Sequence, residues 1–103
     1  MKKKSYKLAK LERERYSLFT DDLDTCIVCK MKATDMNETF RGRNRQNSMK
    51  YGLCIPMCRR CHSILTDNFE LENKWKIKGQ KMFMEHYNKT IQEFIDIFKM
   101  NYL

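Results

Sequence analysis

The sequence reads Cys26-Ile27-Val28-Cys29 near its start and Cys58-Arg59-Arg60-Cys61-His62 further along. Each Cys-x-x-Cys pair can place two thiolates on one metal ion, and two pairs complete the tetrahedral sulfur set that Zn²⁺ accepts. The four cysteines therefore predict a structural zinc site that joins two distant parts of the chain.

The size of the chain makes such a site important. A single domain of 103 residues buries only about 60–70% of its unfolded surface. Zinc binding contributes on the order of 10 to 16 kcal/mol of apparent free energy to the folding of small zinc domains. Loss of the metal is therefore expected to unfold the centre of the molecule.

The compartment follows from the pattern of apolar residues. No apolar run approaches the roughly 20 residues that cross a bilayer, and the basic start at residues 1–5 is not followed by the apolar stretch of a secretory signal. We expect a cytoplasmic protein with no membrane partner, where paired cysteines bind metal more often than they form disulfides. A disulfide framework is the alternative. The fifth cysteine, Cys54, lies in an apolar run and is interpreted as a core residue.

The charge indicates the kind of partner. The formal net charge is +8, and a zinc tetrathiolate, with two negative charges, leaves the chain basic. Residues 41–60 contain six cations and no acid: Arg41, Arg43, Arg45, Lys50, Arg59 and Arg60. This run lies between the two cysteine pairs and favours a polyanion such as the phosphate backbone of DNA, held against the metal centre. A solvated basic surface is the alternative.

Helices are expected on both sides of the zinc segment. Leucines three to four residues apart, with Glu and Arg between them, predict an amphipathic helix over residues 3–19. A helical pattern covers residues 68–87, with His86 interpreted as a packing residue. Thr90 and Glu93 have the spacing of a capping box, which predicts a last helix.

The segment between the cysteine pairs reads as two strands. The expected elements are a knuckle hairpin at 29–33, strands at 34–40 and 51–57, a basic loop at 41–48, and a helix starting near Cys61. Pro56 makes the second strand an edge strand or ends it. The fold class is therefore α+β, in one domain at 1–103, with an N-terminal basic helix and connector (1–25), a zinc core (26–66) and two C-terminal helices (67–103).

These residues resemble the HNH endonuclease pattern, in particular the small HNH proteins encoded by bacteriophages of Gram-positive bacteria. The resemblance covers nearly the whole chain. It rests on Asn37-Glu38-Thr39-Phe40, Gly42, Asn44-Arg45, Ser48, Tyr51-Gly52-Leu53, Met57-Cys58, Cys61-His62, Gly79-Gln80, Phe83 and Asn101-Tyr102-Leu103. The chain departs from the family pattern at Asn37, where the pattern has a strand-one His.

The resemblance implies a ββα-metal fold of the HNH or treble-clef kind, which presents a second ion such as Mg²⁺ or Mn²⁺ to a phosphodiester. In that pattern His62 and Asn37 occupy ligand positions for the second ion, and Glu38 occupies the position of the general base. Two alternatives stay open: Glu38 is itself a ligand, or His62 caps the knuckle or joins the zinc set.

Two functions follow. The first is a metal-dependent DNA endonuclease of the HNH type, encoded by a phage and acting in the cytoplasm of the bacterial host. The second is a non-catalytic HNH-like zinc module that binds DNA or blocks a host protein. The apolar stripe of the last helix and the Tyr102-Leu103 end also allow a homodimer, and the sequence assigns no base preference.

Overall fold

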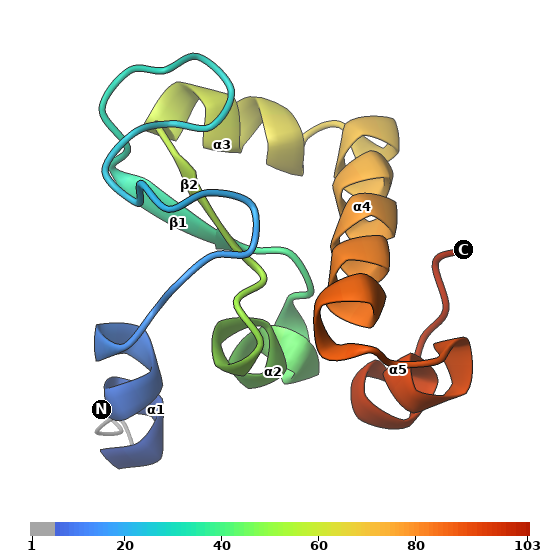
Figure 1. Cartoon of the computed structure of the whole chain (residues 1–103). Coiled ribbons are helices and arrows are strands. Elements are labelled where there is room, and N and C mark those ends of the chain that lie inside the picture. The colour runs from blue at the N-terminus through green and yellow to red at the C-terminus, as the bar shows by residue number, and fades with distance from the viewer. Residues whose placement is uncertain (1–5) are drawn as a thin grey trace.

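The computed structural model describes residues 6–103, which form five α-helices, one 3-10 helix and a two-stranded antiparallel sheet. The helices are α1 (Tyr6–Arg13), α2 (Arg45–Lys50), α3 (Arg59–Thr66), α4 (Phe69–Tyr87) and α5 (Ile91–Phe98), and the 3-10 helix η1 spans Gly42–Asn44. The strands are β1 (Asp35–Glu38) and β2 (Cys54–Met57). Figure 1 shows α4 along one side of the molecule, with α3 leading into its start and α5 folded back at its end. The α+β class predicted from the sequence is confirmed.

The sheet is a short antiparallel hairpin. Asp35 pairs with Met57, and Glu38 at the other end of β1 pairs with Cys54. Pro56 has no amide hydrogen to donate, but β2 has a strand neighbour on one side only, so the proline is tolerated there. Its carbonyl accepts a hydrogen bond from the amide of Ile27 at 3.0 Å, which ties the first cysteine knuckle to the sheet.

Two buried clusters form the core. The larger one contains Phe40, Leu53, Phe83, Phe94 and Phe98. The smaller one lies under the cysteines and contains Cys26, Ile55, Met57 and Leu65. Phe19 packs against both clusters and makes an edge contact with Trp75, with ring centroids 5.5 Å apart.

The N-terminal helix is shorter than the sequence predicts. Its expected start at residue 3 lies outside the described residues, and α1 ends at Arg13 rather than at Phe19. The chain after α1 instead runs beside the segment that precedes β2: Ser17 forms a bridge with Leu53, and the Leu18 amide donates to the Gly52 carbonyl at 2.7 Å. Residues 17 and 18 therefore bond to the segment before β2 and do not form the last turns of the expected helix.

The expected basic loop at 41–48 is also wrong, because η1 and α2 occupy most of it. Polar side chains of this segment are held by α5: the Asn44 amide group donates to the Phe98 carbonyl at 2.8 Å, and that of Asn47 to the Ile97 carbonyl at 3.2 Å. These two hydrogen bonds satisfy carbonyls at the end of α5 that have no partner within the helix, and they hold η1 and α2 against α5.

The C-terminal helices agree with the prediction. Asn68 caps α4 by accepting from the Leu71 amide at 3.0 Å, and the capping box of Thr90 and Glu93 opens α5. His86, predicted to be a core or helix-packing residue, does not lie in the core, because its side chain is exposed; it lies edge-on to Tyr87 of the same helix. In the described part of the chain, no helix has the length and apolar character needed to span a membrane.

Candidate metal centre and neighbouring polar sites

The four cysteines predicted as zinc ligands come together. The Sγ atoms of Cys26, Cys29, Cys58 and Cys61 all lie within 4.8 Å of one another, and those of Cys29 and Cys58 are 3.6 Å apart. Sulfurs at the corners of a tetrahedron with Zn–S bonds of about 2.3 Å would be about 3.8 Å apart. The set therefore has the size and chemistry of a structural Zn²⁺ site.

Two local structures aim the sulfurs at a common point. In the first knuckle the Cys26 amide donates to the Met31 carbonyl at 2.7 Å, and Lys30 turns the chain with a positive φ of 68°. In the second, Cys58 is the N-cap of α3, and its sulfur accepts from the Cys61 amide at 3.4 Å. Both pairs are thus held by backbone hydrogen bonds as well as by any bound ion.

The pKa values of the thiols differ across the set. Burial opposes ionisation of Cys26, yet backbone hydrogen bonds from Cys29 and Cys58 lower its pKa to about 6. Burial, together with hydrogen bonds to the other thiols, raises the pKa of Cys61 to about 12. A bound Zn²⁺ would offset this, because its charge favours the thiolate form of every ligand.

The fifth cysteine stands apart from the metal set, as predicted. Cys54 is fully buried in β2, and burial raises its pKa to about 12. Among residues 6–103, the four ligand cysteines form the one group of three or more His, Cys, Asp or Glu side chains close enough to share an ion.

His62 follows the last cysteine and contacts β1. Its Nδ1 lies 2.9 Å from Oδ2 of Asp35, and Nε of Arg59 lies 3.0 Å from the same oxygen. The hydrogen bond with His62, followed by the charge of Arg59, outweighs burial and lowers the pKa of the Asp35 carboxyl group. Because Nδ1 is engaged, Nε2 is the ring nitrogen of His62 that remains for a ligand.

Asn37 and Glu38, the two β1 residues predicted to belong to the catalytic site, have different surroundings. Asn37 is nearly buried, and since side chains alternate along a strand it lies on the same face of β1 as Asp35. The hydrogen-bond partner that the structure gives His62 is nevertheless Asp35. Asp35 is not among the site residues predicted from the sequence, although its place two residues before Asn37 puts it on the same strand face.

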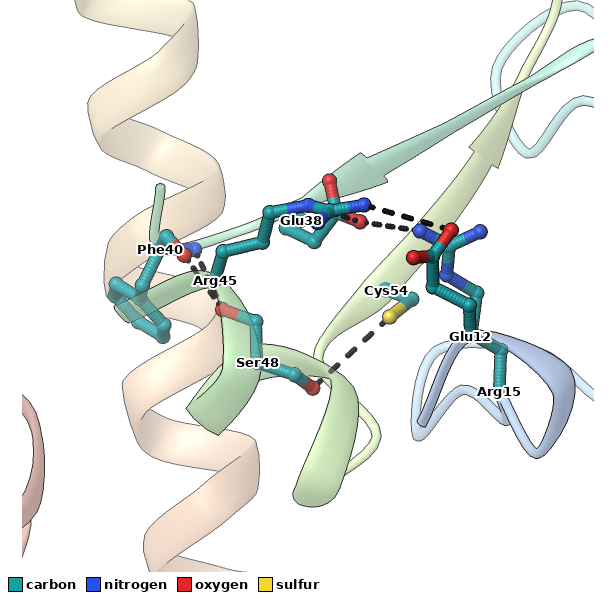
Figure 2. Close-up of polar contacts among 7 residues, drawn as sticks. All are labelled: Glu12, Arg15, Glu38, Phe40, Arg45, Ser48 and Cys54. Carbon is teal, nitrogen blue, oxygen red and sulfur yellow. Dashed lines mark hydrogen bonds and ion pairs between the residues drawn. The ribbon is translucent and has the colours of Figure 1, made fainter. Parts of the chain in front are cut away.

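Glu38 lies on the opposite face of β1 and is held by two arginines (Figure 2). Its Oε1 atom is 2.7 Å from Nη2 of Arg15 and 3.4 Å from Nε of Arg45. Arg45 also lies 3.8 Å from Oε2 of Glu12 in α1. The Glu38 side chain is only 13% exposed. Here it links β1 to α2 and to the segment that follows α1.

The six cations predicted to contact phosphate divide into two groups. Arg41, Arg45 and Arg59 pair with carboxylates of Glu72, Glu38 and Asp35, respectively. Within residues 6–103 no ion pair engages the other three, which are exposed: Arg43, Lys50 and Arg60.

A basic groove lies between α1 and α2. It has a volume of about 340 Å³, and its lining includes Lys7, Lys10 and Lys50, with Glu14 as its acid. The six cations predicted from the sequence to contact phosphate do not include Lys7 and Lys10, although their spacing places them on neighbouring positions of one helix.

Comparison of the chain with family models, curated proteins and solved structures gives no match.

Proposed function

We propose that this chain is a zinc-stabilised module of the HNH type that binds the phosphate backbone of DNA and does not cleave it. The observation that carries the proposal is the groove between α1 and α2, which Lys7, Lys10 and Lys50 line together. Three ammonium groups around one groove favour an anion, and the net charge of +8 favours a large one.

The order of the central elements supports the HNH type. A hairpin of β1 and β2 is followed directly by α3, and the cysteine set ties the loop before β1 to the start of α3. This order is what the ββα-metal fold requires. The arrangement of these elements therefore supports the proposal.

The state of the acidic groups favours binding over cleavage. Hydrolysis of a phosphodiester at such a site needs a divalent ion and a base for the attacking water. Glu38, in the position of the base, is held by Arg15 and Arg45, and Asp35, the carboxylate nearest His62, is held by Arg59. A guanidinium group at each carboxylate opposes the approach of a second cation.

The proposal is tested by anisotropy of a labelled DNA duplex titrated with zinc-loaded protein between about 50 and 200 mM salt. We expect the affinity to fall steeply with salt. Lys10→Glu and Lys50→Glu should each weaken binding about tenfold and make the salt dependence shallower by about one unit of log–log slope. Lys81→Glu in α4 makes the same charge change at an exposed site away from the groove and serves as the control.

Three results would contradict the proposal. They are an affinity that does not change with salt, groove variants that bind as tightly as the parent protein, and a Lys81→Glu variant that loses as much affinity as they do. Parallel titrations with single-stranded and branched DNA identify the preferred form of the nucleic acid.

Metal-dependent cleavage is the second candidate, and the pair of Asp35 and His62 favours it. A carboxylate bonded to Nδ1 orients the ring and increases the basicity of Nε2, as in many metal sites. The test is nicking of plasmid DNA with Mg²⁺ or Mn²⁺. Cleavage that is lost in His62→Ala and in Glu38→Ala would establish the endonuclease and overturn the binding-only proposal. Cleavage that both variants retain would indicate a contaminating nuclease.

A further inference from the structure

An apolar groove lies beside the cysteine set, on a part of the molecule that the DNA proposal does not use. It has a volume of about 220 Å³ and is lined almost entirely by apolar side chains. Met57, Leu65 and Trp75 belong to its lining from β2, α3 and α4, and Val28 and Ile64 line it from the first knuckle and from α3. Its volume is sufficient for one or two large side chains.

Part of the apolar lining of this groove is exposed to solvent. Val28 is 54% exposed and Ile64 is 50% exposed, although both belong to its lining. Met31, three residues after Val28 in the same knuckle, is 68% exposed. A contiguous apolar surface of this kind commonly marks a site of interaction with another protein.

Cations flank the groove. Nζ of Lys78 lies 5.1 Å from the ring centroid of Trp75. Arg60 is exposed and lies one helical turn before Ile64 on α3, which puts the two side chains on one face. In the part of the chain that the structure describes, neither cation has a carboxylate within ion-pair distance. The acid nearest to Arg60 in sequence is Asp67, and the acid nearest to Lys78 is Glu72, which pairs with Arg41 and Lys76 instead.

We propose that this groove binds a short acidic segment of a partner protein. One or two large apolar side chains of the segment enter between the first knuckle, α3 and α4, and its carboxylates meet Arg60 and Lys78. A nucleic acid does not suit the groove, because its apolar lining offers phosphate no donor. A second copy of this chain is disfavoured, because each copy carries a net charge of +8.

The chain contains its own probe for this site. Trp75 is the single tryptophan of the sequence and lines the groove, so its fluorescence reports on what enters. The ligand for the test is a synthetic peptide with two leucines one helical turn apart, flanked by glutamates. We expect a saturable blue shift of Trp75 emission in the full-length, zinc-loaded protein. Replacing the two leucines by serine should weaken binding at least tenfold, as should replacing the glutamates by lysine.

Two groove variants and one control variant locate the site. Ile64→Glu puts a charge at the groove and should weaken peptide binding about tenfold, because an apolar side chain near the centre of an interface carries a large share of its energy. Ile91→Glu makes the same change at another exposed isoleucine, on α5, and should leave binding unchanged. Lys78→Glu is the second groove variant, for use if Ile64→Glu does not retain one zinc per chain.

Three outcomes would overturn the proposal. The first is Trp75 emission that does not respond to the acidic peptide at millimolar concentration. The second is an equal response in the two isoleucine variants or to the lysine-flanked peptide. The third is an emission shift that depends on protein concentration without peptide, which would assign the groove to a second copy of the chain.

Discussion

Oε1 of Glu38 in β1 lies 2.7 Å from Nη2 of Arg15, so an ion pair joins the segment after α1 to the sheet. Both side chains are largely buried, at 13% and 21% exposure. Glu38→Gln removes the charge that two arginines share, and we expect a loss of about 2 kcal/mol in the free energy of unfolding. The measurement is urea denaturation of zinc-loaded protein.

The matched control for this variant is Asp96→Asn in α5, which changes an exposed acid to its amide and should cost less than about 0.5 kcal/mol. A double-mutant cycle with Arg15→Met should give a coupling energy of at least about 1 kcal/mol. Equal stability of the Glu38→Gln variant and the parent would show that the ion pair does not hold the segment after α1 against the sheet.

Removal of the metal should unfold the centre of the molecule. Cys58→Ser deletes one of four sulfurs, and we expect it to lose the stoichiometric zinc and most of the helical circular dichroism of α3 and α4. Cys54→Ala removes a buried thiol outside the set and should keep one zinc per chain at a cost of about 1 kcal/mol. Elemental analysis distinguishes the two. A folded, metal-free preparation would refute the zinc assignment.

Two glycines with similar backbones should respond differently to substitution. Gly42 has a φ of 65° and open space around the position of a Cβ, so Gly42→Ala should cost about 1 kcal/mol in backbone strain. Gly52 has a φ of 74°, and a Cβ there would lie 2.5 Å from Cε2 of Tyr16. We expect Gly52→Ala to cost about 3 kcal/mol in thermal or urea denaturation. Equal losses would mean that the contact with Tyr16 is not formed.

The capping box of α5 predicts a dependence of stability on pH. Thr90→Ala should cost about 1 kcal/mol near neutral pH, because the Glu93 amide loses its acceptor. The hydrogen bond from the Thr90 amide lowers the pKa of the Glu93 carboxyl group below its ordinary value of 4.5. A lowered pKa in the folded state stabilises the protein above the unfolded pKa and ceases to do so as the pH falls through the folded value. Glu93→Gln should therefore flatten the stability curve below about pH 5, as measured by urea denaturation at several pH values.

The sequence was most informative where a local rule is strict. The spacing of the cysteines identified the metal set, because Cys-x-x-Cys pairs have few other uses in a small basic chain. The capping box located the start of α5 for the same reason, since Thr90 and Glu93 satisfy each other's amides without help from the rest of the fold. Both features depend on residues that are close in the chain.

Features that depend on distant partners were not predicted. α1 ends early because Leu18 bonds to Gly52, and residues 42–50 are helical because α5 supplies carbonyls to Asn44 and Asn47. The contact between Asp35 and His62 was not predicted for the same reason, since alternation along β1 gives the face of Asp35 but does not show that α3 packs there. The pairing of arginines with Glu38 and Asp35 was not predicted either, because a count of charges does not show which of them face each other.

The two core clusters differ in how much of the chain must exist before each can form. The cysteine set is complete once Cys61 has left the ribosome, whereas Phe40 waits for Phe98 and Tyr102, whose rings lie 4.9 and 5.3 Å from it. We expect zinc to be captured during translation, while the aromatic cluster is still incomplete. Cysteines of ribosome-stalled chains should then resist alkylation before Tyr102 emerges. A cell short of zinc would release chains whose centre stays unfolded and open to proteases.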